Sequence, residues 1–235
     1  MRQGPWDRET SERHARWASI ASGLFYAPFA RRIARSLASL KGDATIVDLG
    51  TGPGTLSVEL GRLLPEAKII GIDPSSEMLE IARMNAHESG ISNFETRTGR
   101  AEEMPVEANS ADLVVSQFSL HEWENPQKGL SEVFRVLRPG GSFVVRDLNR
   151  GWLSKWKLGL LRFLATMTGE SYQDHLEMFK FTLGQVAALL REAGFDRIEE
   201  KGRGPVLLVQ AFKVDLDSAR SRERGVSGRN EVSRS

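Results

Sequence analysis

The first informative absence in this 235-residue sequence is cysteine, of which it has none. Without a thiol the chain can form no disulfide, no zinc–thiolate site and no iron–sulfur cluster. Radical chemistry on a cysteine-held cluster and catalysis through a covalent cysteine adduct are therefore excluded.

Long apolar runs and a net charge are also missing. No stretch approaches the roughly 18–20 uninterrupted apolar residues of a membrane span, and residues 1–17 contain no apolar segment of the kind found in a signal peptide. The 32 basic residues nearly balance the 31 acidic ones, so the overall charge argues against a nucleic-acid partner. We therefore expect a cytoplasmic protein with one main domain and a sizeable hydrophobic core.

The most informative segment present is TIVDLGTGPG at residues 45–54. A short apolar run leads through Asp48 to Gly50, Gly52 and Gly54, and a helix-like run follows. Glycine adopts backbone angles closed to other residues, and free N–H groups at a helix start attract polar ligands. The segment therefore predicts a cradle for a nucleotide-like ligand. Its G-x-G-x-G spacing departs from the dinucleotide fingerprint G-x-G-x-x-G, and the Gly-Lys-Ser/Thr of a phosphate loop is absent.

Apolar strands alternate with helical segments through the first two thirds of the chain. This rhythm predicts an α/β fold with a doubly wound parallel sheet. Two further strands, separated only by residues 201–205, predict a C-terminal antiparallel hairpin. The seven expected strands are at residues 45–49, 68–72, 93–97, 112–117, 142–148, 195–200 and 206–212, with a tight turn at 138–141.

Composition divides the chain into three parts. Residues 1–42 are expected to form an N-terminal helical cap, with helices at 7–21 and 26–40. Residues 43–213 form the main domain, with an insertion at 151–180. Residues 214–235 are rich in serine and arginine and are predicted to be a disordered tail.

The order acid-x-Gly-x-Gly-x-Gly resembles motif I of the class I S-adenosylmethionine-dependent methyltransferases. The resemblance extends over about residues 43–212 and is closest to small-molecule enzymes similar to the ubiquinone/menaquinone C-methyltransferase group. It implies a Rossmann-like sheet of seven strands, S-adenosyl-L-methionine as cofactor, and methyl transfer to a small, apolar or aromatic acceptor.

The resemblance also implies the cofactor-binding residues. Asp73 ends the second strand about 25 residues after Asp48, where an acid can accept both ribose hydroxyls; NAD-binding proteins share this device, and a helix-capping role before Pro74 can coexist with it. In the family, the acid matching Asp48 orients the loop and the methionine end, and a purely structural role is an equal alternative. The full predicted set is Asp48, Gly50, Thr51, Gly52, Gly54, Asp73, Pro74, Arg100, Ala101, Glu102, Ser116 and Gln117.

The segment GRAEEMP at residues 99–105 is similar to the family stretch that frames the adenine. Arg100 stands where the family commonly has an aspartate that accepts a hydrogen bond from the adenine amine, and arginine has no acceptor atom. Two alternatives follow: the backbone at Ala101 and the carboxylate of Glu102 read the adenine, or Arg100 stacks on the ring.

The segment ADLVVSQFSLHEW at residues 111–123 is similar to motif IV. It lacks the Pro-Pro signature of methyltransferases that act on amino groups of bases and on glutamine, and it looks instead like the small-molecule C- and O-methyltransferases. His121 is the candidate catalytic base, because imidazole titrates near neutrality. The alternative, which we favour, is that His121 hydrogen-bonds the loop and shapes the pocket. No clustered carboxylates point to a metal.

The insertion is expected to carry a substrate lid, as this position does in the family. Trp152 and Trp156 would then contact the acceptor, with Tyr26 on the opposite wall. A helix that covers the core or makes a dimer contact is the second alternative, and peripheral membrane contact by a basic amphipathic helix is the third.

Two other functions compete with methyl transfer to a small-molecule partner. One is a catalytically idle S-adenosylmethionine-binding regulatory module, and the other is an NAD-dependent oxidoreductase, which the glycine spacing and the closing hairpin disfavour. The arginine-rich tail could touch RNA, although nucleic acid is disfavoured as a substrate. The identity of the acceptor, the atom methylated and the oligomeric state are left open by the sequence.

Overall fold

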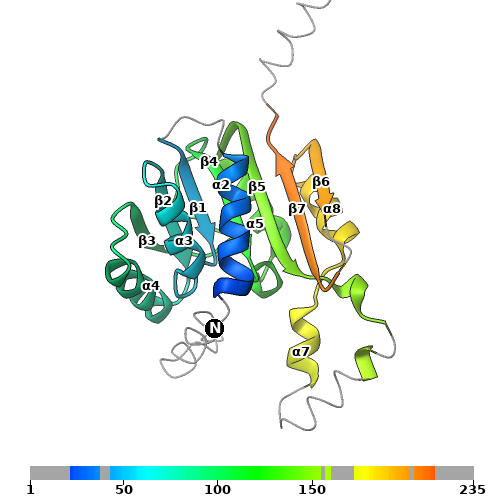
Figure 1. Cartoon of the computed structure of the whole chain (residues 1–235). Coiled ribbons are helices and arrows are strands. Elements are labelled where there is room, and N and C mark those ends of the chain that lie inside the picture. Colours follow the sequence, from blue (N-terminus) through cyan, green and yellow to red (C-terminus); the bar gives the residue numbers. More distant parts are fainter. Residues whose placement is uncertain (1–21, 38–42, 155–156, 160–171, 202–203, 215–235) are drawn as a thin grey trace, which may run out of the picture.

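The computed structural model of the chain describes residues 22–37, 43–154, 157–159, 172–201 and 204–214 (Figure 1). The predicted helix at 7–21, the predicted tail beyond residue 214 and Trp156 lie outside these residues. The division into cap, main domain and lid therefore stays a prediction for the segments concerned. No helix within the described ranges is long and apolar enough to cross a membrane.

The described residues form a seven-stranded sheet in the order β3-β2-β1-β4-β5-β7-β6. The first five strands are parallel, whereas β7 runs antiparallel to β5 and β6 antiparallel to β7. The predicted doubly wound sheet with its C-terminal hairpin is confirmed. The strands are β1 (Thr45–Leu49), β2 (Lys68–Asp73), β3 (Phe94–Thr98), β4 (Ala111–Gln117), β5 (Leu137–Leu148), β6 (Arg197–Lys201) and β7 (Val206–Phe212).

Helices and helical turns connect these strands. Several begin at side-chain caps that the sequence supplies: Ser75 accepts from the amide of Met78, and Thr182 forms a capping box with Gln185. The helical elements are η1 (Ser22–Tyr26), α2 (Ala27–Ser36), α3 (Thr55–Leu63), α4 (Ser76–Glu88), η2 (Leu120–Glu122), α5 (Pro126–Val136), η3 (Arg150–Trp152), α7 (Tyr172–Met178) and α8 (Leu183–Glu192).

Each face of the sheet carries its own apolar core. On one face, α2 and α3 pack through residues such as Phe29 and Leu60 against alternate residues of β1, β4 and β5. On the other face, α5 and α8 pack through residues such as Leu130 and Leu190. Because side chains alternate along a strand, consecutive residues of β4 and β5 point into different cores. Figure 1 shows α2 crossing one face and α5 and α8 behind the sheet.

Two local predictions need correction. The segment 138–141, predicted as a tight turn before a strand at 142–148, is the irregular start of β5, which already pairs Leu137 with Ala111. Gly140 has a φ of 82°, and a register shift between Ala111 and Leu113 absorbs the extra residues. The helix predicted from residue 26 is preceded by the π-helical turn η1 and continues only to residue 36.

Candidate active site at the carboxyl ends of the strands

The glycine loop between β1 and α3 is held by backbone hydrogen bonds from Gly50 and Thr51 to the carbonyl of Ile72, at 2.8 and 3.0 Å. Gly50, Gly52 and Gly54 all have φ between 51° and 75°, the left-handed region that favours glycine. A Cβ on Gly52 would meet no atom within 4 Å, whereas one on Gly54 would lie 2.9 Å from Ala82. The backbone at Gly52 therefore faces open space, whereas the absence of a side chain at Gly54 lets Ala82 of α4 pack closely against the glycine loop.

Asp48 lies beneath this loop and is 1% exposed. Its Oδ2 atom accepts hydrogen bonds from Thr51 Oγ1 at 3.0 Å and Ser57 Oγ at 2.7 Å. Burial raises its pKa to about 6, while the two hydroxyl donors act in the opposite direction. These contacts support the loop from below. Neither Asp48 nor Thr51 is among the residues that line the neighbouring cavity.

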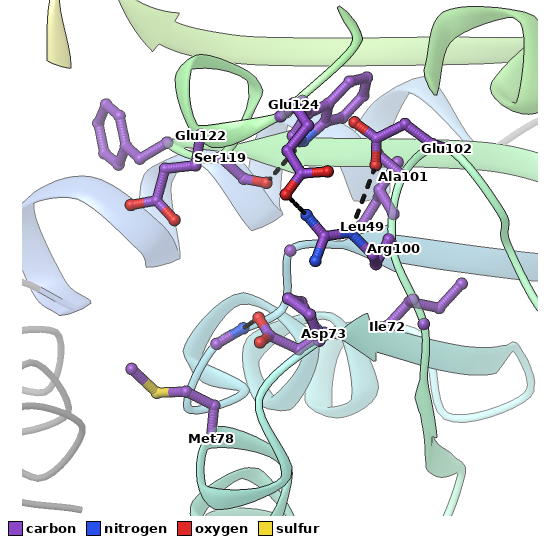
Figure 2. Close-up of a pocket in the computed structure, with 16 residues that line it drawn as sticks. Leu49, Ile72, Asp73, Met78, Arg100, Ala101, Glu102, Ser119, Glu122 and Glu124 are labelled. Atoms are coloured by element: carbon purple, nitrogen blue, oxygen red, sulfur yellow. Dashed lines mark hydrogen bonds and ion pairs between the residues drawn. The ribbon is translucent and has the colours of Figure 1, made fainter. Parts of the chain in front are cut away.

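The cavity opens beside the glycine loop at the carboxyl ends of β1, β2 and β4 (Figure 2). Asp73 lies in its wall, where its two oxygens accept from the amides of Gly52 at 2.9 Å and Ser75 at 3.0 Å. Burial raises the pKa of Asp73, and both amide donors oppose that shift. The lining residues are Leu49, Gly50, Gly52, Ile72, Asp73, Pro74, Met78, Gly99, Arg100, Ala101, Glu102, Phe118, Ser119, Glu122, Trp123 and Glu124.

The cavity thus brings together the predicted residues from the glycine loop, the end of β2 and the segment after β3. Gly54, Ser116 and Gln117 lie outside its lining. Sequence reasoning missed most of the loop after β4, which supplies five lining residues, Phe118, Ser119, Glu122, Trp123 and Glu124. It also missed the apolar walls at Ile72 and Met78, although both flank the predicted Asp73.

The loop after β4 turns sharply because Phe118 has a φ of 55°, an unusual value for a bulky residue. Beyond it, the indole N–H of Trp123 donates to Ser119 Oγ at 3.0 Å. A Cβ on Gly50 would collide with the Ser119 side chain. The absence of a side chain at Gly50 therefore lets the two loops meet along one side of the cavity.

Arg100 is engaged with carboxylates. Its Nη2 atom lies 2.6 Å from Glu124 Oε1 and its Nε atom 3.9 Å from Glu102 Oε2. Figure 2 shows Arg100 and Glu124 pointing toward one another at the cavity wall. Glu102 also accepts from the amide of Asn125 at 2.9 Å. Glu102 and Glu124 therefore place two carboxylates beside Arg100, which stands where the family commonly has an aspartate.

His121 has a buried carboxylate partner that the sequence did not indicate. Asp147 on β5, 1% exposed, lies 2.8 Å from His121 Nδ1 and accepts from the His121 amide at 3.1 Å. Burial lowers the pKa of His121, but Asp147 outweighs this effect and leaves it above the ordinary value. The residue is not part of the cavity lining.

The predicted substrate residues Tyr26 and Trp152 lie in different parts of the structure. Tyr26, the last residue of η1, is 8% exposed and packs in the core. Burial, and secondarily the charge of Asp48, raises its pKa to about 12. Trp152 lies in η3 beyond β5, where its ring stacks against Lys157, with 3.5 Å between the ammonium and the ring centroid. Neither residue lines the cavity.

Comparison with known proteins agrees with this arrangement. Residues 40–200 match a family model described as a methyltransferase domain, which is more than half of the chain. A demethylmenaquinone methyltransferase of Lactococcus lactis is 29% identical over 199 residues, which are 78% of this chain and 79% of the relative. An uncharacterised Escherichia coli protein, YafE, is 27% identical over 66% of this chain and 79% of its own length.

Solved structures share the fold. A SAM-dependent methyltransferase from Aquifex aeolicus superposes with a TM-score of 0.66 at 21% identity, over 89% of this chain and all of that one. A phosphoethanolamine N-methyltransferase of Haemonchus contortus, solved with S-adenosyl-L-methionine, gives a TM-score of 0.64 at 16% identity, over 80% of this chain and 53% of its own. The chain belongs to the methyltransferase domain family, whose model matches residues 40–200.

Proposed function

We propose that the cavity beside the glycine loop binds S-adenosylmethionine and that the methyl group passes to a small, apolar or aromatic acceptor. The observation that carries this proposal is that Gly52 and Asp73 meet in one cavity. Gly52 leaves open space beside the backbone, and Asp73 is fixed by two amide donors.

The residues present suit this cofactor. Each oxygen of Asp73 takes one amide donor and keeps lone-pair capacity for a ribose hydroxyl. Ile72, Met78 and Ala101 provide an apolar wall for the adenine ring. Because Arg100 has no acceptor atom, we assign recognition of the adenine amine to the carboxylate of Glu102, with the Ala101 backbone beside it. In this assignment Arg100 neutralises the charge of the neighbouring carboxylates Glu102 and Glu124.

The cofactor supplies a methyl group already activated on a sulfonium. What remains for the chain is to hold cofactor and acceptor in line and to exclude water. The glycine loop and the loop after β4 do this by packing on one another at Gly50 and Ser119. No strong acid–base machinery is needed for such a reaction.

The acceptor class is supported by two observations. The rings of Phe25 and Phe118 lie edge to face at 6.3 Å, next to the cavity that Phe118 lines. The relatives named demethylmenaquinone methyltransferases act on a quinone, which supports an aromatic acceptor for this chain.

We assign His121 a positioning role. Both its amide and its ring bind Asp147, so the pair ties the loop after β4 to β5.

Calorimetric titration with S-adenosylmethionine, S-adenosylhomocysteine and NAD tests the site. We expect micromolar binding of the two adenosyl ligands only, lost in Asp73→Ala and in Gly52→Val. Gly90→Val is the matched control, because Gly90 also has a positive φ, 68°, with nothing within 4 Å of an added Cβ. Unchanged affinity in folded Asp73→Ala and Gly52→Val would contradict the assignment, and preferential NAD binding would favour the oxidoreductase alternative.

A further inference from the structure

A half-buried cation lies beside the cofactor cavity without a carboxylate partner in the described part of the chain. Arg146 on β5 donates through Nη1 to the carbonyl of Phe25 at 2.6 Å. Its guanidinium is surrounded by the rings of Phe25, Phe29 and Phe118, with centroids 5.4–5.8 Å away. Aromatic faces attract a cation but do not accept hydrogen bonds as a carboxylate does. The remaining guanidinium donors are therefore available to a ligand.

Gln117 provides the second polar group. It pairs in register with Arg146 across β4 and β5, so both side chains project from the same face of the sheet. Gln117 is 6% exposed, and among the described residues neither its amide nitrogen nor its amide oxygen has a hydrogen-bond partner. Buried polar groups are nearly always paired in native proteins, so an amide left open on both atoms indicates a missing ligand.

Tyr26, the last residue of η1, is the third polar residue of the cluster that Arg146 and Gln117 begin. It follows Phe25, whose carbonyl accepts from Arg146, and it is buried in the same apolar cluster as Phe29 and Val115. Its phenol interacts electrostatically with both Asp48 and Arg146. Asp48 faces the same side of the sheet and accepts hydrogen bonds from the hydroxyls of Thr51 and Ser57. With a pKa of about 12, the phenol remains a hydrogen-bond donor at neutral pH.

Phe118 joins this cluster to the cavity. Its ring centroid lies 5.5 Å from the Cζ atom of Arg146, and the same residue lines the cofactor cavity. Its φ of 55° is a strained conformation for an aromatic residue, and such strain concentrates at functional sites. The cavity and the polar cluster therefore share one wall.

We propose that Arg146, Gln117 and Tyr26 form the acceptor subsite, and that the acceptor carries an ionised oxygen on an aromatic or apolar body. The guanidinium fork suits a carboxylate, phenolate or enolate oxygen, Gln117 and Tyr26 donate to the same group, and the three phenylalanine rings contact the body. This inference rests on the proposed function, because it takes the neighbouring cavity to be the cofactor site.

The carboxylate of the cofactor's methionine end offers the same chemistry. We assign Arg146 to the acceptor because β5 is two strands away from β1, whose end carries the glycine loop. The experiment must therefore separate binding of the acceptor from binding of the cofactor.

The test uses the full chain saturated with S-adenosylhomocysteine and titrated with 2-naphthoate and with its uncharged analogue 2-naphthamide. We expect the wild type to bind the carboxylate at least about 10-fold more tightly than the amide, as charge-assisted hydrogen bonds predict. Arg146→Met should abolish this preference and Gln117→Leu should reduce it. Arg31→Met, which removes an exposed arginine of α2, should retain it. All variants should bind S-adenosylhomocysteine within about 3-fold of the wild type, which also reports folding.

The contrary outcomes are distinct. If the wild type binds both probes equally or neither, or if Arg146→Met keeps the preference, the subsite is refuted. If Arg146→Met loses S-adenosylhomocysteine while Arg31→Met keeps it, Arg146 serves the cofactor and the acceptor assignment is wrong. If the folded wild type itself fails to bind S-adenosylhomocysteine, the proposed cofactor cavity is refuted first.

Discussion

The most quantitative prediction concerns Asp48. In the folded chain burial raises the pKa of Asp48 to about 6 from its ordinary value of 3.8, so the folded state binds more protons than the unfolded state between these values. The free energy of unfolding must then fall as pH rises through that interval. The difference between the two pKa values corresponds to about 3 kcal/mol of unfolding free energy in all, of which about 2 kcal/mol is lost between pH 4 and pH 7.

Asp48→Asn removes this titration and keeps the size of the side chain. We expect urea unfolding, without cofactor, to show that the difference in unfolding free energy between wild type and Asp48→Asn falls by about 2 kcal/mol from pH 4 to pH 7. The asparagine also changes the hydrogen bonds to Thr51 and Ser57, which adds an offset at every pH but no slope. If the difference in unfolding free energy between wild type and Asp48→Asn does not change from pH 4 to pH 7, burial does not raise the pKa of Asp48 and this reasoning is refuted.

Three further predictions follow from the packing and charges. In Asp147→Asn the pKa of His121, measured by NMR titration, should fall below its wild-type value. The ion pair adds stability that is full below the unfolded pKa of about 6.5 and is lost as pH rises through the folded pKa. We expect this pH-dependent stability to disappear in Asp147→Asn. Gly54→Ala should destabilise the protein by about 1–3 kcal/mol more than Gly140→Ala in urea unfolding, because both glycines have positive φ but only Gly54 would press a Cβ on Ala82. Leu130→Ala, at a fully buried position, should cost about 2–5 kcal/mol in the same assay.

Each of these has a contrary result. An unchanged His121 pKa in Asp147→Asn would mean that the carboxylate does not set the titration. Equal losses for Gly54→Ala and Gly140→Ala would show that only backbone strain matters at Gly54. A loss under about 1 kcal/mol for Leu130→Ala would contradict the close packing of α5 on the sheet.

Local pattern was enough to predict the order of the seven strands and the helices α3, α4, α5 and α8, but not η1 or α7. The alternation of apolar strands with helices set the sheet class, and Gly50, Gly52 and Asp73 marked the end of the sheet at which the cavity lies. These features are readable because glycine conformations, caps and apolar periodicity act over a few neighbouring residues. The boundaries of β5 were less predictable, because the start of that strand depends on its pairing with Ala111.

The site residues divide in the same way. Gly50, Gly52 and Asp73 line the cavity, as the sequence predicts, because their positions follow from the ends of the strands that precede them. The resemblance places Ser116 and Gln117 in the cofactor set, whereas in the structure both lie outside the cavity lining and the chain turns at Phe118, so that the residues after Gln117 line the cavity.

The fold class, the glycine loop and the acid at the end of β2 are already encoded in the amino-acid sequence, since each depends on short-range stereochemistry. Only the packed structure shows that Asp147 holds His121, that Glu124 pairs with Arg100, and that Arg146 lies among three rings with no carboxylate partner among the described residues. The bond from Arg146 to Phe25 joins residues 121 positions apart. Pairings of this kind depend on which strands and loops meet in space, and no local pattern in the chain encodes them.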